Sequence, residues 1–502
     1  MEAVSGLTRD VLDRARRSRD ARFDGRFFIA VRSTRIYCRP ICPSRFSDDS
    51  NVRYFATAEE AAEAGYRPCL RCRPEAAPGS PAWTGTSAVV QRALKLIQDG
   101  ALNQASVGHL ANRLGIGVRH LSRLFSQHVG ASPATVAQTR RLHFAKRLLD
   151  DTDLRITDIA HASGFGSIRR FNDAFLATYR RSPRELRKGR RIGHDARDND
   201  AEITLRLAYR PPYDWNHIHA FLAKGAIPGI ETVTADGYAR AAQTPSGHAV
   251  LQIRPVARAH ALEVRIQGAM PAELPLLLSA VRRMFDLTAD PARIAAAMRS
   301  DSLLRPLIAE RPGLRIPGVW EPFECCARAI VGQQISAAKQ SSVLTRLVER
   351  FGQPIEPLLT DITHLFPTPA TLALANLDEL GLTGMHGEAL RQLARGVCDK
   401  SIRFDAPSEE ISRMLCALPR VGRWTAGYVE LRGLGEPDAL PFGDLLLRRL
   451  ASTGAKALTP MALEARAECW RPFRGYAVFH LWAAAQLAAA LDTVRRPKTA
   501  GS

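Results

Sequence analysis

The sequence predicts a multidomain protein that is mainly α-helical and has α+β parts. Its 502 residues are too many for one hydrophobic core, so we expect roughly three or four domains. Two polar stretches, RPEAAPGSPAW from residue 73 and RKGRRIGHDARDNDAE from residue 187, have the composition of linkers. The spacing of apolar residues is helical before the second linker, strand-like directly after it, and helical again further on.

These patterns divide the chain into four predicted domains. The first is small and holds four closely paired cysteines, the second and fourth are helical, and the third is α+β. The expected bounds, in chain order, are 1–78, 84–188, 202–286 and 287–492. In the third domain the segments ITLRLAY, TVTADGYARAA, AVLQIRP and ALEVRIQG alternate like strands, and helices are expected at 214–224 and 271–286.

The charge of the chain indicates a polyanionic partner. Lys and Arg number 70 against 50 Asp and Glu, which gives a net charge of +20 and a pI near 10.1. Residues 84–190 alone hold 18 Lys and Arg against 7 Asp and Glu, more than half of the excess. DNA or RNA is the usual partner of such a surface, and a basic protein without a nucleic-acid partner is the alternative.

The sequence has no apolar targeting segment at its start and no apolar run of membrane-spanning length. We therefore expect a cytoplasmic protein with no membrane partner. Disulfides are rare in that reducing compartment, so its cysteines should be free thiols or metal ligands.

Four of the nine cysteines form two tight pairs. Cys38 and Cys42 have the spacing C-x3-C, and Cys69 and Cys72 follow as C-x2-C. Four thiolates at these spacings can surround one tetrahedral ion, and thiolate ligands in a reducing compartment favour Zn²⁺. The pattern leaves two interpretations open: a structural zinc clip, and a zinc site whose own thiolate reacts.

The sequence around these cysteines, VRSTRIYCRPICPSRF followed by NVRYFATAEEAAEAGYRPCLRCRP, resembles the zinc domain of the Ada family of alkylation-response proteins. The resemblance implies that Cys38 accepts a methyl group from a methyl phosphotriester in DNA while Cys42, Cys69 and Cys72 hold the zinc with it. A zinc-bound thiolate stays deprotonated at neutral pH and is a nucleophile without a separate base. Methylation removes one negative charge from the site and should strengthen its association with DNA.

The second predicted domain contains an internal repeat. ASVGHLANRLGIGVRHLSRLFSQHVGASP is followed about fifty residues later by LRITDIAHASGFGSIRRFNDAFLATYRRSP, and each reads as helix, Gly-containing turn, helix and Ser-Pro stop. The pair resembles the helix-turn-helix domain of AraC-type regulators, which implies duplex DNA and RNA polymerase as partners. A plain helical bundle with a solvated basic face is the alternative. Expected DNA contacts are Arg119, His120, Ser122, Arg123, Ser167, Arg169, Arg170 and Asn172.

The fourth predicted domain contains LPRVGRWTAGYVELRGLGEPDALPFGDLLLRRL, residues 418 to 450. A Pro-x-Val-Gly turn joins two helices, and the backbone N–H groups around Val421, Gly422 and Arg423 can hold a DNA phosphate. Further on, Asp444 stands directly before an apolar helix. Taken alone, an aspartate at that position is more often a helix N-cap than a catalytic group.

The hairpin, the loop and the aspartate together resemble the helix-hairpin-helix DNA glycosylases, and the bacterial 3-methyladenine DNA glycosylase II subfamily most closely. FECCARAIVGQQIS and WRPFRGYAVFHLW match the same subfamily, as does the α+β segment 202–286. The resemblance implies that Asp444 stabilises positive charge at the sugar C1′ and helps to position the attacking water. No lysine stands where bifunctional relatives carry a Schiff-base nucleophile, so we expect a monofunctional glycosylase acting on alkylated DNA.

Aromatic residues in these segments are candidates for the base pocket. Trp424 and Tyr428 are four residues apart and so share one helix face, and Trp482 matches another pocket position. Electron-poor alkylated purines are attracted to aromatic faces once flipped out of the duplex. Gln334 stands where some relatives carry a bulky wedge. The chain departs from the family at Arg420, where glycine is common, and at Ala483, where an aromatic can stand.

The preferred hypothesis is an alkylation-response protein that joins a phosphotriester sensor, a DNA-binding regulator and a glycosylase, and acts as a monomer. Its sequence lacks the Pro-Cys-His-Arg motif with which other Ada proteins repair O6-methylguanine. The alternative is a transcription regulator whose glycosylase-like part is inactive.

Overall fold

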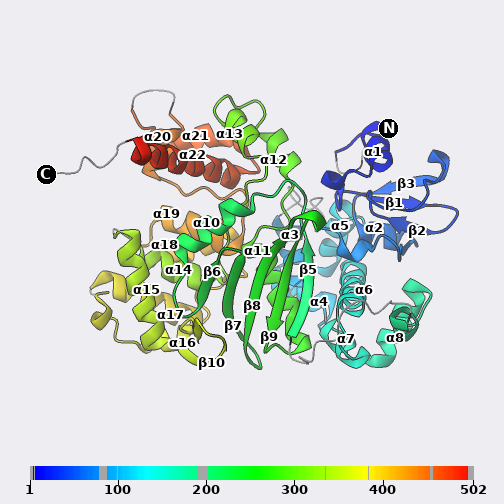
Figure 1. Cartoon of the computed structure of the whole chain (residues 1–502), viewed down its shortest axis with the longest axis horizontal. Helices are drawn as coiled ribbons and strands as arrows, with labels where there is room; N and C mark the ends of the chain where they lie inside the picture. Colours follow the sequence, from blue (N-terminus) through cyan, green and yellow to red (C-terminus); the bar gives the residue numbers. More distant parts are fainter. Residues whose placement is uncertain are drawn as a thin grey trace.

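The computed structural model describes residues 4, 6–78, 88–98, 100–103, 105–188, 202–333, 335–382, 384–452 and 456–495. We name four parts of it by sequence range. They are the cysteine lobe (6–78), the repeat lobe (88–188), the sheet lobe (202–286) and the hairpin lobe (287–495). The expected linker segments 79–83 and 189–201 lie outside the described residues. Figure 1 shows the sheet lobe in the middle, with the hairpin lobe on one side and the other two lobes on the opposite side.

The cysteine lobe is built on a small sheet of order β3-β1-β2-β4. Its strands are β1 (Phe28–Val31), β2 (Ile36–Cys38), β3 (Val52–Phe55) and β4 (Arg67–Pro68), and its helices are α1 (Arg9–Ser18) and α2 (Ala58–Glu63). Strands β2 and β4 are parallel and pair Tyr37 with Pro68. Because the next residue of each strand is a cysteine, this register brings Cys38 and Cys69 to the same end of the sheet.

The repeat lobe contains two similar helix pairs separated by a long helix. The pairs are α4 (Val107–Arg113) with α5 (Val118–His128), and α7 (Ile156–Ala162) with α8 (Ile168–Tyr179). The other helices are α3 (Ala88–Gln98), α6 (Pro133–Asp151) and α9 (Pro183–Lys188). Gly115 and Gly164 have φ of +71° and +79° in the two tight turns, a conformation that favours glycine. The internal repeat in the sequence is therefore a repeat in the structure.

The Ser-Pro pairs mark helix starts as well as helix ends. Ser132 accepts a hydrogen bond from the Thr135 N–H at the N-terminus of α6, and Pro133 is the first residue of that helix. Pro183 likewise begins α9. Proline suits the first helical position because its φ is already helical. An N–H at that position would have no acceptor within the helix, so its absence costs nothing. The sequence predicted each Ser-Pro pair as a helix stop, and in the structure each pair also begins the next helix.

The sheet lobe has a five-stranded antiparallel sheet of order β5-β9-β8-β7-β6. The strands are β5 (Glu202–Ala208), β6 (Glu231–Thr234), β7 (Gly237–Thr244), β8 (Gly247–Val256) and β9 (Ala261–Gln267). Helix α10 (Trp215–Gly225) agrees with the expected 214–224. The helix expected at 271–286 is a short 3₁₀ turn followed by α11 (Leu274–Met284). Three of the four strand-like segments are single strands, and the segment TVTADGYARAA contains two, β6 and β7, joined by a tight turn.

The hairpin lobe is helical, as expected, with one unpredicted hairpin. The helices are α12 (Pro291–Ala297), α13 (Leu304–Glu310), α14 (Pro322–Val331), α15 (Ala337–Phe351), α16 (Pro369–Leu374), α17 (Met385–Cys398), α18 (Ser408–Cys416), α19 (Arg423–Val429), α20 (Leu445–Leu450), α21 (Pro460–Ala467) and α22 (Arg474–Arg495). Strands β10 (Gln353–Leu359) and β11 (Ile362–Leu365) pair with each other, and Ile362 packs against Ala239 and Val250 of the sheet lobe.

One hydrophobic core crosses the junction of the repeat and sheet lobes. Leu142 of α6 and Phe171 of α8 belong to the same buried cluster as Leu251 of the sheet and Val281 of α11. The two lobes are consequently not independent units, because burial of apolar surface between them holds them together.

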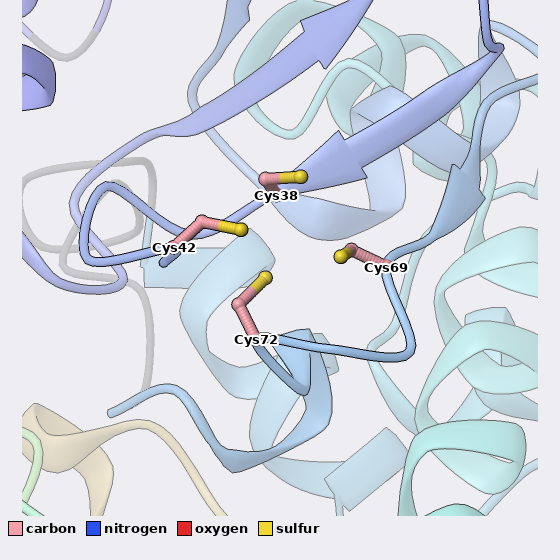
Figure 2. A group of neighbouring side chains, drawn as sticks. All are labelled: Cys38, Cys42, Cys69 and Cys72. Carbon is pink, nitrogen blue, oxygen red and sulfur yellow. The ribbon is translucent and has the colours of Figure 1, made fainter. Parts of the chain in front are cut away.

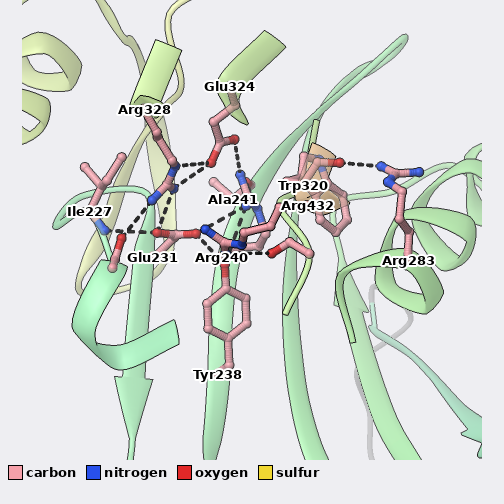
Figure 3. Close-up of polar contacts among 12 residues, drawn as sticks. Ile227, Glu231, Tyr238, Arg240, Ala241, Arg283, Trp320, Glu324, Arg328 and Arg432 are labelled. Carbon is pink, nitrogen blue, oxygen red and sulfur yellow. Dashed lines mark hydrogen bonds and ion pairs between the residues drawn. The ribbon is translucent and has the colours of Figure 1, made fainter. Parts of the chain in front are cut away.

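A buried network of charged side chains joins the sheet lobe to α14 (Figure 3). Arg240 lies 3.3 Å from Glu231 and 3.0 Å from Glu324, and Arg328 bridges the same two carboxylates at 2.9 and 2.5 Å. Tyr238 also donates to Glu231 at 2.6 Å. Burial raises the pKa of Glu231, but Arg328 and Arg240 lower it by more, to about 2. Each buried charge is thus paired, as burial requires.

Within the described residues, no helix combines the length and apolar character needed to cross a bilayer.

Candidate functional site

The four paired cysteines converge on one point (Figure 2). Cys38 ends strand β2, Cys42 lies in the loop that follows, and Cys69 and Cys72 lie in the loop after β4. All four Sγ atoms lie within 4.8 Å of one another. Tetrahedral Zn–S bonds of about 2.3 Å require sulfurs roughly 4 Å apart, so only small shifts are needed to hold the ion. The two pairs therefore form one zinc site, as the sequence predicted.

The titration of the thiols fits a metal site. Hydrogen bonding with Cys42, then with Cys69 and Cys72, raises the pKa of Cys38, while hydrogen bonding with Cys38 lowers the pKa of Cys42. Such a cluster shares protons because four adjacent thiolates repel one another. A divalent cation replaces those protons when it binds.

The four sulfurs are not equivalent. Cys42, Cys69 and Cys72 have exposed fractions of 8%, 8% and 7%, whereas Cys38 is partly exposed. The Arg39 N–H donates to Cys72 Sγ at 3.3 Å, and the Arg39 guanidinium donates to the Cys72 carbonyl and pairs with Asp24. Hydrogen bonding reduces the basicity of a thiolate, so Cys72 is the poorer nucleophile. Cys38 is the most exposed of the four residues.

The predicted DNA-contacting side chains lie on the second helix of each repeat. Arg119, His120, Ser122 and Arg123 are exposed on α5, while Leu121 and Phe125 on the opposite side are fully buried. On α8, the exposed residues are Arg169, Arg170 and Asn172. Ser167 is instead partly buried and caps α8 by accepting the Arg170 N–H. Ser167 therefore already has a structural role in the absence of DNA.

The helical hairpin joins α18 to α19 through residues 417–422. Arg420 has φ of +64°, a strained value for a residue with a side chain, in the position where the sequence departs from the family. The Gln333 side chain supports the turn by donating to the Arg420 carbonyl at 3.0 Å and to Thr425 Oγ1 at 3.2 Å. These contacts offset the strain that glycine would avoid.

The predicted phosphate-binding residues of this turn differ in accessibility. Val421 is 5% exposed and its N–H donates to the Leu418 carbonyl at 3.2 Å, so it shapes the turn. Gly422 and Arg423 are exposed. The Arg423 guanidinium lies 3.5 Å from the centre of the Phe442 ring, in the loop that leads to Asp444.

Asp444 has two roles in the structure. Its Oδ1 accepts the Leu447 N–H at 2.7 Å, so the side chain caps α20. Its Oδ2 accepts a hydrogen bond from Trp424 Nε1 at 2.8 Å. The two interpretations of this residue in the sequence are thus compatible, because the cap uses one oxygen and fixes the direction of the other.

The predicted aromatic residues lie along one strip that consists of two groups of contacting rings. Trp424 stacks on Tyr428 with centroids 5.3 Å apart and an interplanar angle of 16°. The ring centroids of Trp482 and Phe479 are 5.2 Å apart, and those of Phe479 and Phe221 of α10 are 5.8 Å apart. All three predicted aromatics belong to this strip.

Arg432 closes the gap in the strip. Its guanidinium lies 4.6 Å from the Phe221 ring and 5.3 Å from the Tyr428 ring, and it donates to the Tyr428 hydroxyl. It lies in a π-helical turn, Glu430–Leu434, directly after α19. Sequence reasoning missed Arg432 and Phe221. The i,i+4 spacing from Tyr428 could have indicated Arg432, but nothing local indicated Phe221.

Two further sequence expectations concern single positions. Gln334 lies outside the described residues. Ala483, where an aromatic residue can stand in the family, is 5% exposed and belongs to the buried cluster of the hairpin lobe against which Trp482 packs.

Comparisons with known proteins agree with this architecture. Three family models match: the metal-binding domain of Ada over residues 12–75, a helix-turn-helix domain over 110–189, and the AlkA N-terminal domain over 204–321. A 3-methyladenine DNA glycosylase from Archaeoglobus fulgidus has the same fold over 56% of this chain and 98% of its own, with a TM-score of 0.50 and 21% identity.

Of three curated relatives, two match part of the chain and one matches nearly all of it. DNA-3-methyladenine glycosylase 2 of Escherichia coli is 32% identical over 281 residues, 55% of this chain and 95% of that protein. The Escherichia coli Ada protein is 33% identical over 162 residues, and the match spans only 44% of its length. A probable bifunctional transcriptional activator/DNA repair enzyme AlkA of Mycobacterium tuberculosis is 38% identical over 472 residues, 93% of this chain and 95% of its own.

Fold and sites together define a DNA-repair protein in which an Ada-type zinc domain and an AraC-type helix-turn-helix domain are joined to a glycosylase of the helix-hairpin-helix class. The agreement extends over nearly the whole chain. The chain belongs to the family of bifunctional AlkA transcriptional activator/DNA repair enzymes.

Proposed function

We propose that this protein removes alkylated purines such as 3-methyladenine from DNA as a monofunctional glycosylase, and takes up methyl groups from DNA phosphotriesters on Cys38. The observation that carries the first part is the geometry of Asp444. One carboxylate oxygen is held by the start of α20, and the other is held by Trp424 at one end of the aromatic strip. A carboxylate so fixed cannot turn away when charge develops near it.

The reaction we propose at Asp444 is hydrolysis of the N-glycosidic bond. Water attacks the sugar C1′, the bond to the base breaks, and the base leaves with its electron pair. An N3- or N7-alkylated purine starts cationic and leaves neutral, so it needs little protonation. Positive charge at C1′ is stabilised by the carboxylate, and the attacking water gives up one proton to the solvent. The Trp424 and Tyr428 rings provide a stacking surface for the flipped base.

The proposed methyl transfer uses the most accessible sulfur. Cys38 Sγ attacks the methyl carbon, the carbon–oxygen bond breaks, and the phosphodiester leaves as an anion, so that a thioether remains on the protein. Zinc supplies the deprotonated state of the thiolates. The partial exposure of Cys38 against 7–8% for the other three cysteines supports this assignment.

The remaining parts of the proposal concern partners and organisation. The exposed faces of α5 and α8 would contact successive major grooves through the predicted residues, and the regulator half would contact RNA polymerase. We propose that residues 1–78, 84–188, 202–286 and 287–492 act as domains of one cytoplasmic monomer.

Excision of 3-methyladenine from methylated duplex DNA tests the glycosylase assignment. Asn is as good an N-cap as Asp, so Asp444→Asn keeps α20 capped while it removes the negative charge and the oxygen that accepts from Trp424 Nε1. We expect at least a hundredfold loss of excision rate with the fold retained. Full activity in that variant would mean that Asp444 is not the catalytic group, whereas no excision by the wild type would leave the alternative, a regulator with an inactive glycosylase-like part.

Transfer of a labelled methyl group from methylated DNA to the protein tests the sensor assignment. Wild type should acquire one label, and Cys38→Ser should acquire none. Cys416→Ser removes an exposed thiol away from the zinc site and serves as the matched control. Label on Cys38→Ser would mean that Cys38 is not the acceptor, and an unlabelled wild type would mean that the zinc is a structural clip only.

A further inference from the structure

A cavity of about 1150 Å³ lies where all four lobes meet, away from the zinc cluster and from Asp444. Its walls include Glu75 of the cysteine lobe, Arg147 of α6, Arg282 of α11 and Phe473 of the hairpin lobe. The volume is slightly above the range for small-molecule sites, about 300–1000 Å³. Neither of the proposed activities uses this cavity.

Two helices that line the cavity, α6 and α11, both contribute positively charged side chains to it. Arg140, His143, Phe144 and Arg147 are spaced at i, i+3, i+4 and i+7, so they share one face of α6, and all four line the cavity. Arg282 of α11 lines it as well. We call Arg140, Arg147 and Arg282 the junction cluster.

The positive charges of this cluster act on one another. Burial, then the charges of Arg147 and Arg140, lowers the pKa of Arg282 to about 9. Burial and the same two arginines lower the pKa of His143 to about 3. The histidine is therefore neutral, and its Nε2 is hydrogen-bonded to the Tyr37 hydroxyl at 2.7 Å.

The carboxylates near the cluster are already engaged by cations. Glu59 lies 3.5 Å from Arg140, and Glu75 lies 3.6 Å from Lys146. Asp151, whose charge acts on Arg147, is bound by Arg73 at 2.8 Å. The Arg147 guanidinium donates to a neutral group, the Glu75 carbonyl, at 2.9 Å.

The Arg282 guanidinium has no hydrogen bond or ion pair with any other group in the part of the chain described here. A partly buried cation without a partner is costly, and in proteins such groups are paired with an anion. Guanidinium groups bind phosphate oxygens in a bidentate manner better than other cations do.

We propose that the junction cluster binds a small phosphate-bearing molecule, either inorganic phosphate or the phosphate of a nucleotide. Phosphate oxygens would accept hydrogen bonds from Arg282 and Arg147 across the cavity, and the Phe144 ring offers an apolar surface for a base. A DNA duplex is too bulky for a cavity of this volume. A ligand held here contacts α6 and α11 at once and so stabilises the packing of the repeat lobe on the sheet lobe.

Binding to the full-length, zinc-loaded protein tests this proposal, with inorganic phosphate and adenosine monophosphate as probes. Thermal shift and titration calorimetry are run at constant ionic strength, with chloride as the reference anion. We expect both probes to raise the Tm of wild type and Arg282→Gln to weaken binding at least tenfold. Arg258→Gln replaces an exposed arginine of the same lobe and should bind within twofold of wild type. Tighter binding of the nucleotide would identify the nucleotide as the ligand, and equal binding would identify free phosphate.

Three outcomes of the binding experiments would overturn the proposal, and a fourth outcome concerns the Tm without a ligand. The first is a wild-type Tm that neither probe raises above the chloride reference. The second is unweakened binding by Arg282→Gln, and the third is an effect of Arg282→Gln on duplex DNA binding alone. Without a ligand, Arg282→Gln should have the same Tm as wild type or a higher one, because it removes an unpaired cation. A strongly lowered Tm would mean that Arg282 already has a partner in the protein, which also contradicts the proposal.

Discussion

At the scale of single residues, the hydrogen bond between Trp424 Nε1 and Asp444 Oδ2 is the contact with the clearest chemical consequence. It orients the carboxylate without neutralising it, and it places that carboxylate beside a stacked aromatic pair. A phenylalanine at position 424 would keep a ring against Tyr428 and remove only the donor.

We therefore predict that Trp424→Phe slows excision of alkylated purine by roughly ten- to a hundredfold, since a hydrogen bond to a charged group contributes about 1.5–3 kcal/mol. Single-turnover excision rates measure this effect. The control is Trp215→Phe, a tryptophan stacked on Phe285 in the sheet lobe. An equal loss in both variants would show that tryptophan replacement acts through stability and not through Asp444.

The buried carboxylate Glu231 gives a pH prediction at the same scale. Its pKa of about 2 in the folded protein lies below the value of about 4.3 expected in the unfolded chain. Its contribution to stability is complete above the unfolded pKa and is lost as pH falls toward 2. The free energy of unfolding should thus fall between pH 5 and 3 in wild type, and fall less steeply in Glu231→Gln. Parallel pH profiles of the two proteins would refute this role.

At the scale of secondary-structure elements, the attachment of α14 to the sheet depends on Arg328, which bridges two buried carboxylates. We predict that Arg328→Met destabilises the protein by about 3–5 kcal/mol, because it leaves buried negative charge poorly paired. Arg350→Met breaks an exposed pair with Glu379 and should cost at most about 1 kcal/mol. Urea unfolding followed by circular dichroism compares the two, and a similar cost for both would exclude the buried network as a stabilising feature.

Much of the element pattern could be predicted from the sequence. The strands of the sheet lobe alternate clearly, and the repeat lobe shows its duplication in the sequence itself. The β10–β11 hairpin was missed because Pro354 and Pro357 make its first strand look unlike a strand; an edge strand tolerates them since it needs fewer N–H donors. The cysteine cluster could be predicted because four ligands at short spacing leave few geometries.

What could not be predicted are contacts between distant segments. Phe221 reaches the aromatic strip from α10, and Arg282 faces α6 across the cavity, although neither has a local signal in the sequence. The interfaces between the lobes are of the same kind, because they depend on how finished domains pack.

At the scale of the whole molecule, buried polar contacts fasten the cysteine lobe to the rest. Arg26 lies 3.0 Å from Asp290, and both side chains are almost fully buried. Arg210 of the sheet lobe is fully buried and donates to the Asp24 carbonyl at 2.9 Å and the Pro78 carbonyl at 3.4 Å. The lobe is therefore a structural partner of the glycosylase half as well as the part that holds the zinc site.

Removal of zinc with a strong chelator tests this arrangement. We predict that chelation lowers the Tm of the glycosylase half, because Arg210 and Asp290 lose partners when the cysteine lobe loosens. The excision rate below that Tm should change less than about twofold, since Asp444 and the aromatic strip lie elsewhere. An unchanged Tm would mean that the cysteine lobe stays packed against the other lobes without the metal.

The pairing of Arg26 with Asp290 also has a consequence for biosynthesis. A ribosome makes the cysteine lobe early, but the carboxylate that receives Arg26 and the guanidinium that receives the Asp24 and Pro78 carbonyls emerge much later. Until then the newly made lobe carries a cation and two acceptors that only water can satisfy. The nascent chain must therefore grow past Asp290 before its first-made part can be locked in place.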